Sequence, residues 1–548
     1  MPQGNLISHH IFLFPFKWTV DTSKVNVHNA ERNLEKVHSS LDSQVWIPFA
    51  FQYGVNESVT FNTYNEYAYF HDYARDILSL DIDGSVSKKQ YAYKLLTDAK
   101  YKIDILGGDT FELEIEDISL NFYETGVGII AFHLNNNEPL TFDKALKINE
   151  YGRRIYPQYL GSGVYENNPT TYTSATKNNF LPNALELLNF GKPILEDFSH
   201  YDDLEKITEH PFKLPNHIQE LLGDNFSTKK YDKQKKIIIQ QGKIILEPII
   251  DDRMFTMSFF VDSERLKILR GYDEDTKSYN WENSPDWHRY IFIDDSTASC
   301  QSKRMMPNIL EPCTYDRWID NKDKGDSIGH IFGITRYSFC ILADDCFFTN
   351  TILKHHFKSQ YFQMAQLVLV QRASILNFSA EVSEISKSPR ANKVSDLYLR
   401  YIKFINKIYF REITPQEQGI ELYKMLHARM DIEQNVKDLD AEIKELHDYV
   451  ALKDGEYRSS RLNLLTIIGF IFLPASFVLS FLGMNYFGSG ALQVNDYINH
   501  SNKVDDNSHS VIWVAIIIGL TILLSLLIWV IIRYLKSFWT FISKNKTI

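Results

Sequence analysis

Two long apolar runs near the carboxyl end dominate the pattern of hydrophobic and polar positions. Leu462–Leu482 reads LNLLTIIGFIFLPASFVLSFL, and Val511–Ile532 is uncharged and almost wholly aliphatic. At about 1.5 Å per residue, each run covers roughly the 30 Å hydrocarbon core of a bilayer. The pattern therefore predicts two transmembrane helices, 462–482 and 511–532. The alternative, a pair of buried core helices, is less favoured because soluble cores rarely need two such runs side by side.

The charges that flank these runs predict their orientation. Lys453, Arg458 and Arg461 precede the first run, a basic tail at 533–548 follows the second, and the loop at 483–510 between them carries more acidic than basic residues. The positive-inside bias places both termini in the cytoplasm and the loop outside. We therefore expect a multi-pass protein of the bacterial inner (cell) membrane, with the lipid bilayer as a partner.

A heptad pattern precedes the first apolar run. The segment Thr414–Glu417 (TPQE) is typical of a helix start, and after Pro415 no proline occurs before Pro474. This predicts one continuous helix from Pro415 to Leu482, with a stalk at 412–461. The seam is expected to pack either between subunits or against helices of its own chain. Its apolar positions are Ile432, Val436, Leu439, Ile443, Leu446 and Val450.

The remainder of the chain is predicted to form an α/β domain at 1–355, followed by an antiparallel helical pair at 356–411. The expected strands are His10–Phe14, Val45–Phe51, Thr110–Ile115, Val127–Leu134, Lys236–Gln240, Lys243–Leu246, Met254–Val261 and His330–Leu342. The expected helices are Asn65–Leu80, Phe142–Arg154, Pro182–Phe190, His356–Ser386 and Ala391–Phe410.

Composition argues against several classes of function. The formal charge of −11, from 69 acidic and 58 basic side chains, is unlike that of a general nucleic-acid binder, so no direct nucleic-acid binding is expected. The four cysteines have no C-x-x-C spacing, which argues against a zinc knuckle and a disulfide framework. The chain also lacks a Gly-rich phosphate loop, H-E-x-x-H and G-x-S-x-G, so we do not expect an enzyme.

A short motif follows the first apolar run. Gly483-Met484-Asn485 stands after Leu465-Thr466 and Pro474, at the outer end of the first of two carboxy-terminal runs. This arrangement resembles the CorA family of divalent-cation channels. The resemblance implies a homopentamer whose first spans line a pore, with the GMN loop as an outer selectivity ring. The expected fold class is thus CorA-like, with an α/β cytoplasmic domain, a long helical stalk and two transmembrane helices.

One face of the first run suits a pore, because small and hydroxylated residues lie toward its outer end and leucines toward the cytoplasm. The face consists of Leu462, Leu465, Gly469, Leu473, Ser476 and Ser480. Five Asn485 amide oxygens could bind a hydrated Mg²⁺ or another divalent cation through its waters, and the leucines could close the path by dewetting. The alternative is that the small residues only allow close packing between helices.

An aromatic and basic cluster is the candidate ligand site of the α/β domain. Arg153 and Arg154 are adjacent, and Tyr156 and Tyr159 follow them. Guanidinium groups suit phosphate and tyrosine faces suit a purine, so these four residues are candidates for binding a nucleotide. The alternative is a surface salt-bridge pair beside a packed Tyr-Pro turn.

Two further features favour a ligand other than metal. The turn at 387–393 is basic, whereas magnesium-sensing CorA-like proteins tend to carry acidic residues there. The opening segment His9–Trp18 resembles, more weakly than the GMN motif does, the CorA-like membrane effectors of type III CRISPR systems. That resemblance implies an antiviral ion channel opened by a nucleotide second messenger such as a SAM–AMP conjugate. The alternatives are a channel for uptake of Mg²⁺ or a related cation, gated by intracellular metal, and a membrane-tethered enzyme.

Overall fold

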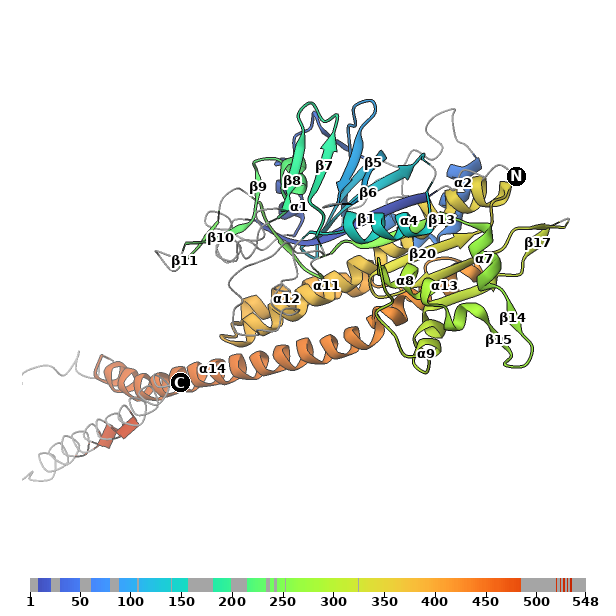
Figure 1. The fold of residues 1–548 in the computed structure, drawn as a ribbon. Coiled ribbons are helices and arrows are strands. Elements are labelled where there is room, and N and C mark those ends of the chain that lie inside the picture. Colours follow the sequence, from blue (N-terminus) through green and yellow to red (C-terminus); the bar gives the residue numbers. More distant parts are fainter. Residues whose placement is uncertain are drawn as a thin grey trace, which may run out of the picture. The chain divides into compact units, whose positions relative to one another are not determined.

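The computed structural model describes residues 8–20, 30–49, 61–78, 88–105, 108–138, 140–155, 181–198, 214–232, 237–240, 244–251, 253–323 and 325–483, together with isolated positions from 519 to 534. The chain divides into two compact units, Met1–Asp448 and Tyr449–Ile548. The first unit is an α/β domain with attached helices, as predicted (Figure 1).

A 14-stranded mixed sheet forms the centre of the first unit. Its main path has the order β16-β19-β20-β13-β1-β6-β5-β4-β7-β8, with β2, β3, β9 and β12 paired off this path. The strands of the path are β1 (Ser8–Val20), β4 (Lys100–Asp104), β5 (Thr110–Tyr123), β6 (Val127–Asn136), β7 (Ala184–Leu188), β8 (Ile194–Asp197), β13 (Phe255–Val261), β16 (Thr314–Trp318), β19 (His330–Ile334) and β20 (Ser338–Ala343). The others are β2 (Trp46–Pro48), β3 (Lys88–Tyr93), β9 (Phe226–Ser227) and β12 (Ile244–Pro248).

Three two-stranded ribbons accompany this sheet: β10 (Lys229–Asp232) with β11 (Ile237–Gln240), β14 (Tyr272–Asp273) with β15 (Ser278–Tyr279), and β17 (Lys322–Asp323) with β18 (Asp326–Ser327). Short helices connect the strands of the first unit. They are α1 (Ala30–His38), α2 (Phe61–Tyr69), α3 (Asp72–Leu78), α4 (Phe142–Gly152), α6 (Asn216–Leu222), α7 (Ser263–Leu269), α8 (Pro285–Phe292) and α9 (Met306–Leu310).

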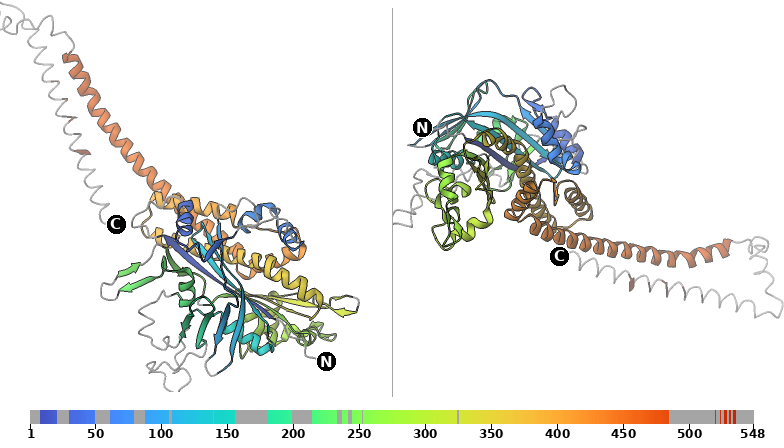
Figure 2. Two further views of the ribbon diagram at one scale, coloured as in Figure 1. Left: turned by 90° about the horizontal axis from the view of Figure 1, so that it is seen from above. Right: turned by 90° about the vertical axis from the view of Figure 1, so that its right-hand side faces the viewer.

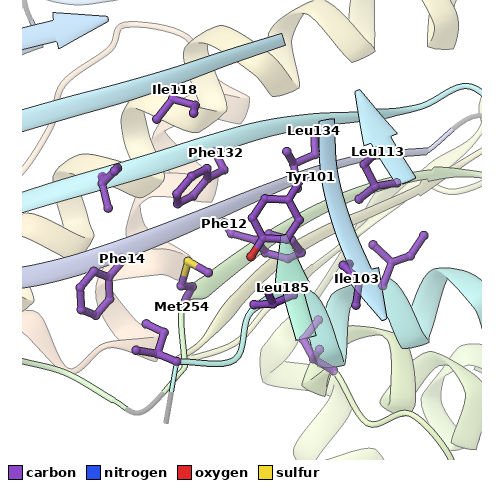
Figure 3. Packing of buried hydrophobic residues seen from close by; sticks show 14 of the residues in the cluster. Phe12, Phe14, Tyr101, Ile103, Leu113, Ile118, Phe132, Leu134, Leu185 and Met254 are labelled. Carbon is purple, nitrogen blue, oxygen red and sulfur yellow. The ribbon is translucent and has the colours of Figure 1, made fainter. Parts of the chain in front are cut away.

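The alternation of side chains along β1 generates two cores. Phe12, Phe14 and Phe16 belong to one hydrophobic cluster, whereas Ile11 and Leu13 belong to the other. Successive side chains of a strand point to opposite faces, so a strand buried on both faces is apolar throughout. Figure 3 shows the first cluster, in which Phe12 lies among residues of β4, β6 and β7.

Helices cover the second face of the sheet. After a short helical entry that includes α10 (Lys354–His356), α11 (Phe362–Ser386) lies along the sheet, and its buried residues join the cluster of Ile11 and Leu13 (Figures 1 and 2). The chain then turns at 387–390 into α12 (Ala391–Lys407). These two helices lie within the range predicted for the helical pair, 356–411.

Several strand predictions are confirmed, and other predictions need correction. The expected strand His330–Leu342 is two strands, β19 and β20, separated by a turn. The expected helix Pro182–Phe190 is instead the strand β7, with Leu185 and Leu187 buried between less buried neighbours. The segment ALELL consists of strong helix formers, and its pairing with β4 and β8 overrides that preference.

The predicted continuous helix from Pro415 to Leu482 is also wrong, because it is interrupted at Asp431. The chain forms α13 (Glu417–Arg429) and then α14 (Ile432–Gly483), and Asp431 between them has a φ of 54°. A residue in the left-handed region ends a right-handed helix without any proline. Aspartate tolerates this conformation better than most residues do. Asp431 was therefore a possible helix end that the sequence prediction missed.

The heptad seam packs against helices of its own chain. Ile432, Val436, Leu439 and Ile443 are buried in one cluster with Leu397 and Tyr401 of α12. The His447 ring stacks on Tyr398 of α12, with 4.8 Å between the ring centroids. Of the two arrangements left open by the sequence, the structure shows the intrachain one for this part of α14.

No helix within the described residues is long and apolar enough to cross a membrane. Most of the second predicted span and the loop after Gly483 lie outside the described residues. The finding on the described helices contradicts two predictions: the fold class with two transmembrane helices and the multi-pass location in the inner membrane.

Candidate functional site

The end of α4 fixes the position of the two candidate arginines. Thr141 caps the start of this helix, and its side chain accepts a hydrogen bond from the Lys144 amide. At the other end, a Cβ on Gly152 would lie 2.7 Å from the Phe12 ring and 2.9 Å from Ile103. The Tyr101 hydroxyl donates to the Gly152 carbonyl at 2.9 Å. Glycine therefore lets α4 end in direct contact with the sheet, and Arg153 follows immediately.

Both arginines bind one carboxylate. The Arg153 Nη2 donates to Glu150 Oε2 at 2.6 Å, and Arg154 donates to the other oxygen of the same side chain. The relative exposures are 8% for Glu150, 2% for Arg153 and 3% for Arg154. We call these three residues the arginine cluster. Charges removed from water are costly unless they are paired, so this geometry requires a partner for each guanidinium at all times.

A residue in an unusual conformation lies against the cluster. Ile293 caps the end of α8 with φ 60° and ψ 50°, and it is buried. A β-branched residue in the left-handed region is disfavoured by about 1–3 kcal/mol. Arg153 Nη2 donates to the Ile293 carbonyl at 3.2 Å, so the guanidinium helps to hold this conformation.

A buried polar network lies on the sheet side of α4. His10 Nδ1 is 2.6 Å from Asn149 Oδ1, Asn149 Nδ2 donates to Ser258 Oγ at 3.0 Å, and Tyr290 OH is 3.1 Å from the same hydroxyl. Burial lowers the pKa of His10 to about 4, although its hydrogen bond to Asn149 acts in the opposite direction. The neutral imidazole therefore donates through Nδ1. Sequence reasoning missed this network, because its members come from four separate elements.

The cluster is linked to the neighbouring strands through the backbone. The Met254 amide donates to the Arg153 carbonyl at 2.8 Å, and Arg154 and Arg253 form an antiparallel bridge. The Arg253 guanidinium lies over the Tyr337 ring, with its Cζ 5.5 Å from the centroid. Tyr337 belongs to the turn between β19 and β20.

That turn contacts the junction between α13 and α14. Arg336 forms an ion pair with Asp431, the residue that separates the two helices. Arg372 of α11 donates through Nη1 to the Arg336 carbonyl at 3.0 Å. A continuous series of contacts therefore runs from the arginine cluster through Arg253 and Tyr337 to Asp431.

The structure places the other predicted site residues as follows. Leu462, Leu465 and Gly469 lie on α14, where the two leucines are 63% and 62% exposed. The side chains of Leu473, Ser476 and Ser480 are outside the described residues, as are Tyr156, Tyr159, Met484 and Asn485, whereas Gly483 is the last residue of α14. Arg153 and Arg154 are ion-paired, as the alternative of a surface salt bridge expected. Both are buried, however, so the pair does not lie at the surface.

Within the part of the chain that the structure describes, no three His, Cys, Asp or Glu side chains are arranged to hold a metal ion. Comparison with models of protein families and with curated proteins finds no match for this chain. The CorA-like resemblance therefore stays a prediction from sequence, and the candidate site depends on its geometry.

Proposed function

We propose that this protein is a ligand-responsive effector. Its α/β domain binds an anionic nucleotide second messenger, such as a SAM–AMP conjugate, at the arginine cluster. The conformational change caused by binding is transmitted to α14. The observation that supports this proposal is that the Glu150 carboxylate accepts hydrogen bonds from two adjacent buried guanidinium groups.

Binding at the cluster is an exchange of partners. The oxygens of a phosphate, like those of a carboxylate, accept paired hydrogen bonds from a guanidinium fork. A phosphate can therefore replace Glu150 without leaving either arginine unpaired in a buried environment. Release of Glu150 would alter the last turn of α4, which Tyr101 and Gly152 hold against the sheet.

Transmission to α14 follows the contacts already described. A shift of Arg154 acts on Arg253 through their backbone bridge, and Arg253 contacts Tyr337. The residue before Tyr337 is Arg336, the partner of Asp431. Because Asp431 separates α13 from α14, a small displacement there changes the direction in which a 52-residue helix begins.

Calorimetric titration of the full chain with a SAM–AMP conjugate tests the proposal. We expect binding by the native protein, loss of binding in Arg153→Ala/Arg154→Ala, and native affinity in Arg304→Ala, where an exposed arginine is removed. Arg153→Lys, which keeps the charge but not the fork, should bind more weakly while remaining folded. Equal affinity in all four proteins, or no heat with the native protein, would reject the arginine cluster as the messenger site.

A further inference from the structure

Tyr337 is held rigidly at the edge of the sheet, beside the start of the long helix. The Thr335 amide donates to the Ser338 carbonyl at 3.0 Å, and the Tyr337 carbonyl accepts from the Thr256 amide at 3.0 Å. The first bond closes the hairpin, and the second joins it to β13. The tyrosine itself remains 36% exposed.

Two guanidinium groups lie at the ring of this tyrosine, and a third arginine is its neighbour in the chain. The Cζ atoms of Arg253 and Arg372 lie 5.5 and 5.3 Å from the centre of its ring, and Arg336 precedes it in the chain. Arg253 pairs with Asp251 at 3.0 Å, and Arg336 pairs with Asp431. Stacking on an aromatic ring leaves the in-plane N–H groups of a guanidinium directed outward, where they can bind another acceptor.

Arg372 differs from its two neighbours. Over the described residues it has no carboxylate oxygen within 4.0 Å, and its hydrogen bond to a backbone carbonyl does not neutralise its charge. Burial is the main cause that lowers the pKa of its guanidinium; Tyr337 and Asp251 oppose this shift, whereas the like charge of Arg336 adds to it. Like charges in one region of a protein are stabilised by a shared anion.

We propose that Arg253, Arg336 and Arg372 around Tyr337 bind the phosphate group of a small molecule, and that the bound phosphate displaces Asp431 from Arg336. This site goes beyond the proposed messenger site, because none of its three arginines belongs to the arginine cluster. The pair that must be broken is a weak one: Arg336 is 42% exposed and Asp431 is 57% exposed. A phosphate that bonds several guanidiniums at once competes well against one exposed carboxylate.

Displacement of Asp431 has a local consequence. The Asp431 amide donates to the Ala428 carbonyl at 3.3 Å, and the Asn435 amide donates to the Asp431 carbonyl at 3.0 Å. These two bonds close the end of α13 and the start of α14. Loss of the ion pair leaves a residue with a disfavoured φ of 54° held by fewer contacts, so the junction should open more often.

The test is titration of the full chain with inorganic pyrophosphate, followed by calorimetry and by hydrogen exchange of the amides of Asp431 and Asn435. We expect saturable binding, at least tenfold weaker affinity in Arg372→Gln, native affinity in Arg304→Gln, and exchange that is several-fold faster with pyrophosphate. Arg336→Gln should show the faster exchange without any ligand. AMP should bind and adenosine should not, which identifies the phosphate as the recognised group.

Two outcomes would overturn this inference. Equal acceleration by sodium chloride at matched ionic strength would show that pyrophosphate acts only by screening. Loss of pyrophosphate binding in Arg153→Gln/Arg154→Gln, with native binding in Arg372→Gln, would place phosphate at the arginine cluster instead. That second result would leave the proposed messenger site intact, so the two proposals fail separately. Arg372→Lys, with the charge kept and the fork removed, should bind with intermediate affinity if the variant proteins are folded.

Discussion

Arg336 binds the carboxylate of Asp431, which lies in the two-residue break between α13 and α14. Arg336 is part of a turn of the central sheet, so this one ion pair connects the α/β domain to the origin of the long helix. Both side chains are exposed, so the ion pair is weak by itself. The proposed transmission to α14 requires an ion pair that can break and form again.

The backbone at Asp431 can be tested separately from its charge. Asp431→Gly removes the ion pair but relieves the left-handed conformation, so we expect a change in the free energy of unfolding within about 1 kcal/mol. Asp431→Ala removes the same pair and keeps the strain, and it should be less stable than the glycine variant by about 1–2 kcal/mol. Chemical denaturation measures both values. Equal stability of the two variants would contradict a requirement for positive φ at this junction.

Close contact at the end of α4 predicts that Gly152 is intolerant of a side chain. Gly152→Ala places a methyl group 2.7 Å from the Phe12 ring, and we expect a loss of about 1–3 kcal/mol in the free energy of unfolding. The matched control is Gly455→Ala in α14, where an added Cβ would have no atom within 4 Å beyond the adjacent residues and the backbone of its own helix. That change should be neutral or stabilising by up to about 1 kcal/mol, because alanine favours a helix. Similar costs at both positions would argue against the packing described for α4.

Packing of the α14 seam within one chain predicts the response to Leu439→Ala. Leu439 is 1% exposed, and its truncation should cost about 2–5 kcal/mol. Leu452, which is 73% exposed on the same helix, should tolerate alanine within about 0.5 kcal/mol. Denaturation at several protein concentrations completes the measurement. A loss at Leu439 that varies with protein concentration would show that the seam packs between chains.

Buried histidines predict that the protein is less stable in acid. His217 is fully buried against Tyr101 and Phe132, and burial lowers its pKa from 6.5 to about 3. The folded state therefore holds it neutral, whereas the unfolded chain takes up a proton as the pH falls below 6.5. The stability that it contributes is fully present above 6.5 and is lost as the pH falls toward 3.

Replacement of this histidine should remove its share of the acid sensitivity. At pH 5 the proton taken up by the unfolded chain costs the folded state about 2 kcal/mol. We expect His217→Leu to lessen the drop in the free energy of unfolding between pH 7.5 and pH 5 by about that amount. His10 and His133, whose pKa values are lowered to about 4 and about 3, should keep part of the drop in the variant. An unchanged pH dependence would contradict a neutral His217 in the folded protein.

Much of the fold could be predicted from local patterns. The alternation of buried positions in the first half of β5, the buried apolar run of β6 and the helices α4, α11 and α12 are all indicated by patterns in the sequence. β7 could not be predicted in this way, since its residues favour a helix and only its neighbours make it a strand. The break at Asp431 was missed because the expected signal was proline, whereas one left-handed residue is enough.

The candidate site was predicted in part. The adjacent arginines were singled out by their chemistry, but their common partner Glu150 lies only one helical turn earlier and was overlooked. Spacing of three and four residues on a helix would have indicated it. The connection through Arg253 and Tyr337 joins segments distant in sequence, and only the folded sheet brings them together.

Exchange of Glu150 for a nucleotide phosphate is the central claim, and the affinity of Glu150→Gln for a SAM–AMP conjugate tests it most directly. Glutamine keeps the shape of the side chain but competes poorly for two guanidiniums, so the conjugate should bind about tenfold more tightly than it binds the native protein. Glu264→Gln, at an exposed position, should leave affinity unchanged. Affinity in Glu150→Gln that is equal to or weaker than that of the native protein would contradict the claim.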